Sequence, residues 1–473
     1  MSQIECLVSM SAIRNLFLKN AVANILGGAG SALFNLLLPA LVVRHLGKLE
    51  FSVWTLALQI LIYLQLFGFG MQIAMTKFIA QGKEIGDVAD QRKTVKAGLM
   101  LVSAFVLVAI LAVILLVIFY PLLFSNIPPA FVGDFRVCIF VLGVSAAWQL
   151  YALIPNGVFV GLQRNIVPVS AVLIIRMLSL LALWLVLENG GGLLALSITL
   201  ATVGAFLVPG SYLFARRWAK YLTIELGAVD WGRFRELWHY CASLAVWNLA
   251  MLFVNGVDMI LVGHFDFEKV AAYSLAVTFI TILVGVLQAV LNPLVAIAAS
   301  SFANPLKVGN LPKLLSLSSL GCSALMVVIV SVFFWIGKDV LKLWVSAEYV
   351  TDVYLILTVI LIAHSIRNAL MPFSIFLIAI AEQKKAFVPA VIEGVVNLCA
   401  SLYLGSRLGA IGIAYATLIG ATAGVLASFI LVVGKTHVLT ISRTRFFTHI
   451  LLLPFFSLII LFLISLKVHH GIF

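Results

Sequence analysis

Charged residues are scarce in this sequence. Only 10% of its 473 residues are Asp, Glu, Lys or Arg, while 63% are hydrophobic, whereas a soluble domain typically carries about 25% charged residues. The apolar residues form runs of about 20 or more, long enough to cross a hydrocarbon core as a helix. These runs do not alternate apolar with polar residues, which excludes a membrane barrel. The sequence predicts an all-α polytopic membrane protein.

Cysteine pairs and catalytic motifs are also lacking. The five cysteines are scattered singly, without metal-ligand spacing, and are expected to be small core residues: Cys6, Cys138, Cys241, Cys322 and Cys399. The sequence has no phosphate-binding GxxxxGK[ST] loop, no HExxH and no Gly-x-Ser-x-Gly motif. The predicted outer loops are short. We therefore expect neither an enzyme nor a bound cofactor or metal.

What the sequence has is a series of long apolar segments on both sides of a polar stretch at 216–239. Twelve segments predict membrane helices, at 18–43, 51–76, 97–124, 136–161, 166–187, 193–215, 240–264, 270–302, 314–337, 352–380, 386–404 and 410–434. A shorter run at 450–466 predicts an extra C-terminal helix. The expected parts are an N-terminal six-helix lobe (1–215), a cytoplasmic connector (216–239), a C-terminal six-helix lobe (240–434) and a basic segment with the extra helix (435–473).

The basic residues predict the orientation of these helices. Lys and Arg are concentrated in alternate loops, which the positive-inside rule assigns to the cytoplasm together with the N-terminus. The net charge of +12 is thereby explained by orientation and by contact with lipid headgroups, so no nucleic-acid partner is expected. Within the connector, Trp231, Phe234, Leu237 and Trp238 favour an amphipathic helix at the membrane surface.

The two halves carry similar short segments at nearly one offset. Residues 43–46 (VRHL) correspond to 262–265 (VGHF), and 190–195 to 409–414, both 219 positions apart. Further matches pair 54–57 with 273–276, and 163–168 with 383–389. Because each half has an even number of helices, both repeats run in the same sense, and a pseudo-twofold axis along the membrane normal is expected to relate the two bundles.

Several of these motifs resemble a known family. They are Leu37 to Pro39, 43–47 with Phe51, 67–70 with 76–78, and Asp258 ahead of 272–276. Over roughly residues 18–434 the chain is similar to the polysaccharide exporters of the multidrug/oligosaccharidyl-lipid/polysaccharide superfamily, in particular the Wzx-type O-antigen flippases. The resemblance implies a MATE-like core of twelve helices that moves lipid-linked sugars.

This resemblance implies a specific activity. The protein would flip an undecaprenyl-pyrophosphate-linked oligosaccharide, such as the O-antigen unit of lipopolysaccharide, across the bacterial inner membrane by alternating access. Its partners would be the lipid-linked oligosaccharide, membrane lipids and a polysaccharide polymerase. Two other functions stay open: a cation-coupled multidrug antiporter of the same superfamily, and a membrane glycosyl polymerase or ligase, which the short outer loops disfavour.

Polar residues within the apolar segments are the candidate site. His364, Arg367 and Asn368 share one face of a helix, and Arg176 lies in the middle of a helix of the other half. An arginine at the bilayer centre costs roughly 2.5–3.5 kcal/mol on insertion scales, so each should face protein or water. Together with Asn156, these residues are the expected substrate-binding groups, because guanidinium groups bind pyrophosphate in a bidentate manner. The alternative for Arg367 is pairing with a neighbouring acid.

Two acids lie within the predicted helices. Glu393 shares a face with Asn397, and Asp258 lies near the end of its helix. Either could pair with an arginine, or could couple transport to H+ or Na+, and Asp258 could also serve as a structural cap. A polar stripe on the first helix, with Asn24, Gly28, Ser31 and Asn35, favours either close helix packing or the lining of a cavity.

Overall fold

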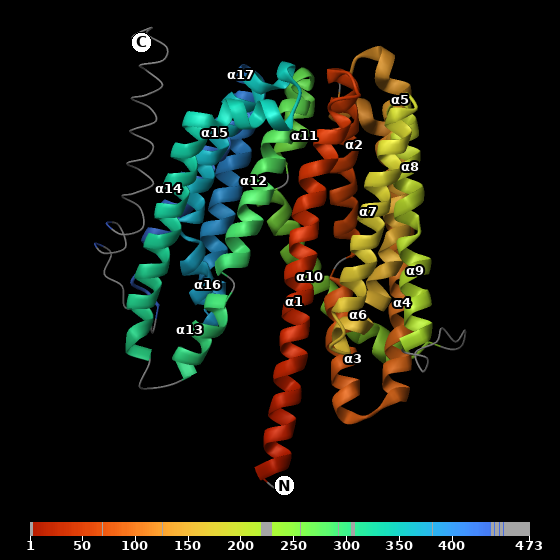
Figure 1. Ribbon diagram of the computed structural model, residues 1–473, viewed down its shortest axis with the longest axis vertical. Coiled ribbons are helices and arrows are strands. Elements are labelled where there is room, and N and C mark those ends of the chain that lie inside the picture. The colour runs from red at the N-terminus through yellow and green to blue at the C-terminus, as the bar shows by residue number, and fades with distance from the viewer. Residues whose placement is uncertain are drawn as a thin grey trace. The chain divides into compact units, whose positions relative to one another are not determined.

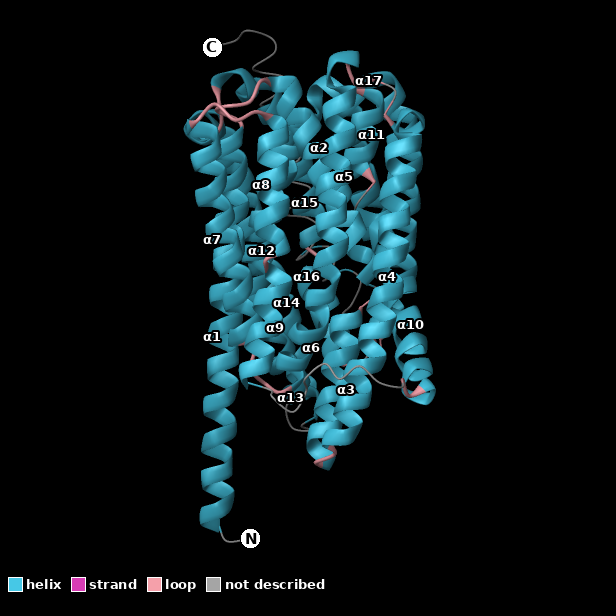
Figure 2. Ribbon diagram, turned by 90° about the vertical axis from the view of Figure 1, so that its right-hand side faces the viewer, coloured by secondary structure: helices cyan, strands magenta, loops and turns pink. Residues whose placement is uncertain are grey.

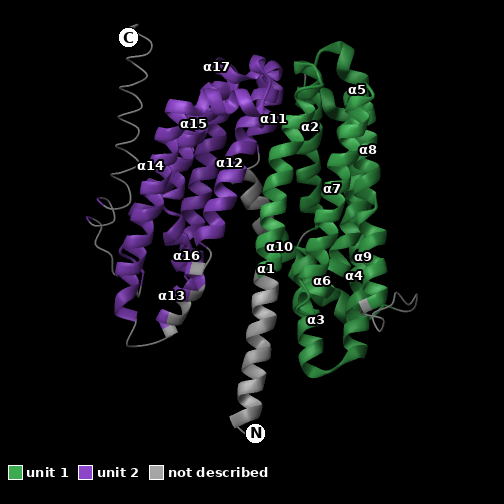
Figure 3. Ribbon diagram, viewed as in Figure 1, with its two compact units in different colours: residues 1–249 green, residues 250–473 purple. Residues whose placement is uncertain are grey.

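The protein is built from helices that form two compact units. The computed structural model describes residues 3–68, 70–124, 126–218, 229–255, 257–291, 293–303, 308–380, 382–436, 439, 444 and 448. Within these residues every regular element is helical (Figures 1 and 2). Unit 1 is Met1–Leu249 and unit 2 is Ala250–Phe473 (Figure 3). The fold is that of an all-α polytopic membrane protein, as the sequence predicts.

Unit 1 contains six apolar spans, three of which are interrupted. Short 3-10 turns separate α2 from α3 and α5 from α6, and the chain also breaks between α8 and α9. The helices of this unit are α1 (Gln3–Val42), α2 (Lys48–Gln65), α3 (Met71–Ile85), α4 (Val88–Leu123), α5 (Val132–Gln149), α6 (Leu153–Gly161), α7 (Ile166–Glu188), α8 (Leu193–Ala205), α9 (Leu207–Trp218) and most of α10 (Trp231–Asn255).

Unit 2 has similar interruptions. Pro293 begins α13 and Pro372 is the second residue of α16, both in the first turn of a helix, where the missing N–H of a proline costs nothing. The helices are α11 (Asp258–Phe265), α12 (Val270–Leu291), α13 (Pro293–Ala303), α14 (Leu311–Trp344), α15 (Ala347–Asn368), α16 (Met371–Ala379) and α17 (Phe387–Leu431). Gly409 bends α17, with φ 64° and ψ −142°, and so divides it into two arms.

The membrane helices predicted from the sequence correspond to helices of the structure. Ten described segments are long and apolar enough to cross a membrane. One of them, Gln383–Leu431, contains both arms of α17, and α10 with α11 covers the helix predicted at 240–264. The extra helix predicted at 450–466 lies outside the described residues. The amphipathic helix expected in the connector is instead the first part of α10, which continues to Asn255.

Breaks and turns recur at the offset found in the sequence. Gly190 and Gly409, 219 positions apart, both have positive φ, 76° and 64°. The break after α5 begins at Leu150 and the break after α15 at Ala369, again 219 apart. Because a positive φ and a helix break are properties of the backbone, their recurrence supports the internal repeat independently of side-chain similarity.

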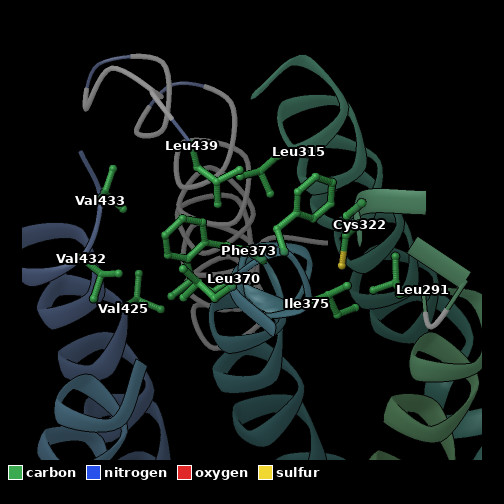
Figure 4. Packing of buried hydrophobic residues seen from close by; sticks show 14 of the residues in the cluster. Leu291, Leu315, Cys322, Leu370, Phe373, Ile375, Val425, Val432, Val433 and Leu439 are labelled. Atoms are coloured by element: carbon green, nitrogen blue, oxygen red, sulfur yellow. The ribbon is translucent and has the colours of Figure 1, made fainter. Parts of the chain in front are cut away.

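Apolar side chains fill the interior and cover the outside of each unit. In unit 2, Leu370, which directly precedes α16, and Phe373 of α16 pack among Cys322 of α14 and Val425 of α17 (Figure 4). Many large apolar side chains of the outward faces are exposed, as expected for helices that contact lipid. Three cysteines, Cys138, Cys241 and Cys322, are buried as predicted, whereas that prediction is wrong for the exposed Cys399.

The beginning of α10 is attached to α4 by charged groups. Asp230 caps α10, because its Oδ1 accepts a hydrogen bond from the Arg233 N–H at 3.0 Å. That bond, and next the hydrogen bond from Lys93, hold the pKa of Asp230 below its ordinary value. The Arg233 guanidinium forms an ion pair with Asp90 of α4 and lies over the Phe78 ring of α3. The described end of the connector is therefore part of unit 1.

The bend of α17 yields a prediction about stability. A Cβ at Gly409 would lie 3.0 Å from Cγ of Asp266, whose Oδ2 accepts the N–H of Ala410 at 3.0 Å and caps the second arm. Gly190 also has a positive φ but open space around its Cβ position. We expect Gly190→Ala to cost about 1 kcal/mol and Gly409→Ala about 3 kcal/mol. Equal shifts of the apparent Tm in detergent would contradict this account of the bend.

Candidate functional site

Unit 2 contains an ion pair between two of the predicted site residues. Nε of Arg367, near the end of α15, donates to Oε1 of Glu393 in the first arm of α17 at 2.5 Å. The two side chains are only 22% and 14% exposed. A charge pair at this depth avoids the cost that either charge would have alone in hydrocarbon. In this structure Arg367 therefore has the acidic partner that the sequence offered as one of two alternatives.

Glycines of the second arm of α17 hold Glu393 in place. A Cβ at Gly424 would lie 2.8 Å from Cβ of Glu393, and a Cβ at Gly420 would lie 2.7 Å from Cβ of Asn397. The two glycines are four residues apart, so they lie on the same face of the second arm, about one turn apart, and both face the first arm. Small residues at this spacing let membrane helices approach closely, which fixes the backbone that carries Glu393.

Asp258, at the start of α11, accepts three hydrogen bonds from uncharged groups. Its Oδ1 accepts from Nδ2 of Asn397 at 3.1 Å, and its Oδ2 accepts from the hydroxyl groups of Thr417 at 3.0 Å and Tyr273 at 3.4 Å. These donors come from both arms of α17 and from α12. Arg367 is close enough to interact electrostatically with Asp258. The result is a compensated polar centre within unit 2.

The remaining predicted residues of unit 2 lie beside this centre. His364 and Asn368 share a face of α15 with Arg367, as the spacing predicts. Nδ1 of His364 and Nδ2 of Asn368 are buried, and neither has a hydrogen-bond partner in the part of the chain that the structure describes. Both atoms are therefore available to a ligand that reaches this face of α15.

In unit 1, the buried arginine has a different environment. The guanidinium of Arg176, on α7, lies over the ring of Phe34 on α1, with Cζ 5.4 Å from the ring centroid. Its Nη1 is buried and makes no hydrogen bond to any described residue. The aromatic ring favours a cation at this point but leaves the N–H donors at Nη1 unsatisfied. Arg176 thus has free hydrogen-bonding capacity at membrane depth.

Four helices of unit 1 (α1, α3, α6 and α7) line an open pocket of about 290 Å³. Its lining is rich in uncharged polar side chains: Asn24, Ser31, Gln72, Asn156 and Asn165. The predicted substrate-binding residue Asn156 is thus placed in a pocket. Of the polar stripe predicted on the first helix, Asn24 and Ser31 line this pocket, whereas Gly28 and Asn35 do not. For those two polar residues the structure favours cavity lining over packing.

Some members of these clusters were missed by the sequence analysis. Thr417 carries no local signal, because its contact with Asp258 joins positions 159 residues apart. Tyr273 was noted only as part of the repeat, and Asn165 only within a matching turn. A polar side chain within or directly beside an apolar segment is the one signal that could have pointed to these three residues. Among the described residues, no group of three or more His, Cys, Asp or Glu is placed to hold a metal ion.

Comparisons with known proteins agree on the fold and the family. Residues 17–299 match the family described as polysaccharide biosynthesis protein. No curated protein matches the sequence. Among solved structures, the chain is similar to the lipid II flippase MurJ in an inward closed conformation, with a TM-score of 0.70 and 17% identity over 95% of this chain and 93% of that one.

Transporters of the MATE type are also similar. An inward-facing multidrug resistance MATE transporter of the MOP superfamily has a TM-score of 0.64 at 14% identity, over 84% of this chain and 93% of that chain. A Vibrio cholerae MATE transporter has a TM-score of 0.60 at 14% identity, over 95% of this chain and all of that one. At these identities the similarity shows the fold, a MATE-like multi-pass membrane protein, and not the substrate.

The ion pair of unit 2 yields a prediction for a double-mutant cycle. Arg367→Met leaves Glu393 without its partner at membrane depth, and Glu393→Gln leaves Arg367 without its partner. Each single substitution should lower stability by about 1–3 kcal/mol, while the double substitution should cost less than the sum. The measurement is the apparent Tm of the four proteins in one detergent. Additive losses would show that the two side chains are not energetically coupled.

Proposed function

Because the chain belongs to the polysaccharide biosynthesis protein family, we propose that it flips an undecaprenyl-pyrophosphate-linked oligosaccharide, an O-antigen or related repeat unit, across the bacterial inner membrane. It acts as a transporter and not as an enzyme. The observation that carries the substrate class is Arg176, whose guanidinium lies at membrane depth with a buried Nη1 that no described residue accepts from. A pyrophosphate supplies the anionic oxygens that such a group lacks.

The proposed cycle is alternating access. The oligosaccharide and the pyrophosphate enter a polar interior from the cytoplasmic side, where the basic loops and the N-terminus lie, while the polyprenyl chain stays in lipid. Arg176 and Asn156 are the proposed binding groups of unit 1, and Arg367, His364 and Asn368 are those of unit 2. An anionic ligand at Arg367 would compete with Glu393 for the guanidinium. Ligand binding would therefore break this ion pair and change the charge balance of unit 2.

Asp258 is the group that we propose for ion coupling. Its three hydrogen-bond donors, Asn397, Thr417 and Tyr273, are uncharged, so they orient the carboxylate without neutralising it. A carboxylate held among amide and hydroxyl groups can bind a proton or a hard cation such as Na+. Glu393, which is already paired with Arg367, is more suited to internal compensation. A polysaccharide polymerase that receives the flipped unit is the protein partner that this function requires.

A cation-coupled multidrug antiporter is the second candidate. The observation in its favour is the fold shared with MATE transporters, together with a carboxylate at membrane depth in unit 2. A cationic drug would be repelled by an arginine that lacks a compensating acid, and Arg176 has no acidic hydrogen-bond partner among the described residues. Resistance to cationic drugs on overexpression, without a glycan defect on deletion, would support this function instead.

The proposed role of Arg176 is tested in cells. Deletion of the gene should stop surface glycan export and leave lipid-linked oligosaccharide on the inner leaflet. Arg176→Gln should reduce export at least about tenfold at equal expression, and Arg176→Lys should restore part of it, because a lysine keeps the charge but not the bidentate geometry. Export is measured as surface glycan per cell.

Arg136→Gln is the matched control, because Arg136 is also an arginine of unit 1 in contact with an aromatic ring, that of Tyr120, but lies at the start of α5. It should leave export unchanged. Normal export by Arg176→Gln would remove Arg176 from the proposed site.

The coupling role of Asp258 is tested by its dependence on ions. Asp258→Asn keeps the shape of the side chain but removes the charge, so transport should no longer respond to an imposed Na+ or pH gradient. Asp339→Asn, at an exposed ion pair with Lys342 in the same unit, should keep that response. The measurement is transport by proteoliposomes with and without each gradient. A normal gradient response of Asp258→Asn would exclude Asp258 as the coupling group.

A further inference from the structure

The pocket of unit 1 contains a buried amide oxygen that the described residues leave unsatisfied. Asn156, on α6, is only 8% exposed, and its Oδ1 has no hydrogen-bond partner in the described part of the chain. Most buried side-chain acceptors in folded proteins are paired, since an unpaired one lowers stability. Asn156 also lines the pocket. Its unsatisfied oxygen therefore indicates a ligand group that donates a hydrogen bond.

The side of the pocket formed by α3 and α6 is held by direct backbone contact. A Cβ at Gly157 would lie 2.8 Å from the carbonyl oxygen of Gln72, and a Cβ at Gly161 would lie 2.8 Å from that of Thr76. The hydroxyl of Thr76 donates to the carbonyl oxygens of Gln72 at 2.8 Å and Gly157 at 3.3 Å. Close packing of α6 on α3 thus places Asn156 next to Gln72 in a fixed geometry.

The opposite side is formed by α1 and α7. A Cβ at Gly27 would lie 2.8 Å from Cγ1 of Val169, so these two helices also pack closely. The hydroxyl of Ser31 donates to the carbonyl oxygen of Gly27 at 2.6 Å, which leaves its own oxygen able to accept. Val169 and Leu173 supply an apolar surface. None of the described residues that line the pocket is charged.

This lining selects a class of ligand. Amide and hydroxyl groups beside an apolar surface match the hydroxyl groups and the C–H face of a sugar ring. Without a charged group, the pocket offers little to a pyrophosphate or to a cationic drug. Its volume of about 290 Å³ lies at the lower end of the range of about 300–1,000 Å³ for ligand sites, which favours one ring over a long oligosaccharide.

Arg176 lies next to this pocket along the same two helices. On α7, Val169, Val172 and Arg176 are three and four residues apart and share a face, so Arg176 lies about 6 Å beyond Val172 along the axis. On α1, the ring of Phe34, over which the guanidinium lies, is one turn beyond Ser31. The uncharged polar pocket and the Arg176 guanidinium, which has an unsatisfied donor, therefore follow each other along α1 and α7.

We propose that the pocket of unit 1 binds the first sugar ring of the lipid-linked saccharide while Arg176 binds the adjacent pyrophosphate. In such a molecule the first sugar is bonded directly to the pyrophosphate, which is the order in which the pocket and Arg176 follow each other along α1 and α7. This inference rests on the proposed function and deepens it, since it assigns recognition of the first sugar to the amides of one unit.

The experiment compares two ligands on the full-length protein in lipid nanodiscs. The probes are undecaprenyl pyrophosphate and undecaprenyl-pyrophosphoryl-N-acetylglucosamine. Wild-type protein should bind the sugar-bearing lipid more tightly. Asn156→Leu should weaken its binding about fivefold to tenfold and leave the binding of undecaprenyl pyrophosphate unchanged, because one hydrogen bond to the sugar is lost. Gln72→Leu, as a second variant, should show the same selective loss.

Two further variants separate the parts of the site. Arg176→Gln should weaken the binding of both lipids, since both carry the pyrophosphate. Asn189→Leu, which replaces an exposed amide at the other end of α7, should change neither. Equal binding of the two lipids by wild type, or equal losses for both in Asn156→Leu and Gln72→Leu, would overturn the sugar subsite while leaving the proposed function intact. Failure of wild type to bind either lipid would overturn both.

Discussion

The structure depends on one constraint: in hydrocarbon, a polar group must find its partner within the protein. The constraint first selects helices, because they satisfy their own backbone groups. Where a helix is interrupted, a side chain satisfies the free backbone groups, or a proline removes the N–H that would lack a partner. Asp266 caps the arm of α17 that follows Gly409, and Pro372, in the first turn of α16, has no N–H to satisfy. Glycines then bring helices together closely enough to bury the remaining polar groups, as where Gly157 of α6 packs against α3.

The same constraint separates polar groups that have partners among the described residues from those that keep an unsatisfied atom. Arg367 is paired with Glu393, and Asp258 receives three hydrogen bonds, so both are compensated within unit 2. Arg176 and Asn156 are different, because each keeps a buried atom that no described residue satisfies. Both lie in unit 1, where Arg176 follows the pocket that contains Asn156 along α7. A substrate that carries an anion next to an uncharged polar ring would satisfy both of them.

Much of the fold could be predicted from the sequence, because hydrocarbon imposes the length and apolarity of each helix. The repeat offset of 219 also proved informative, since Gly190 and Gly409 both have a positive φ, which supports the repeat independently of side-chain similarity. The breaks within the spans were not predicted, because an apolar run is equally compatible with one helix or two. Within the candidate site, the arginines and acids could be predicted, because a charged side chain in an apolar segment has a high free-energy cost in a membrane. Their partners did not, since contacts such as Asp258 to Thr417 depend on how distant helices pack.

The central claim is that this member of the polysaccharide biosynthesis family moves a lipid-linked saccharide across a membrane. The most direct test reconstitutes the purified protein in proteoliposomes that contain an undecaprenyl-pyrophosphate-linked saccharide with an oxidisable sugar. An external oxidant that cannot cross the bilayer then measures how much saccharide reaches the outer leaflet. We predict that the protein carries the saccharide from the inner leaflet until nearly all of it is oxidised. Protection of the inner half, equal to that in liposomes without protein, would contradict the account.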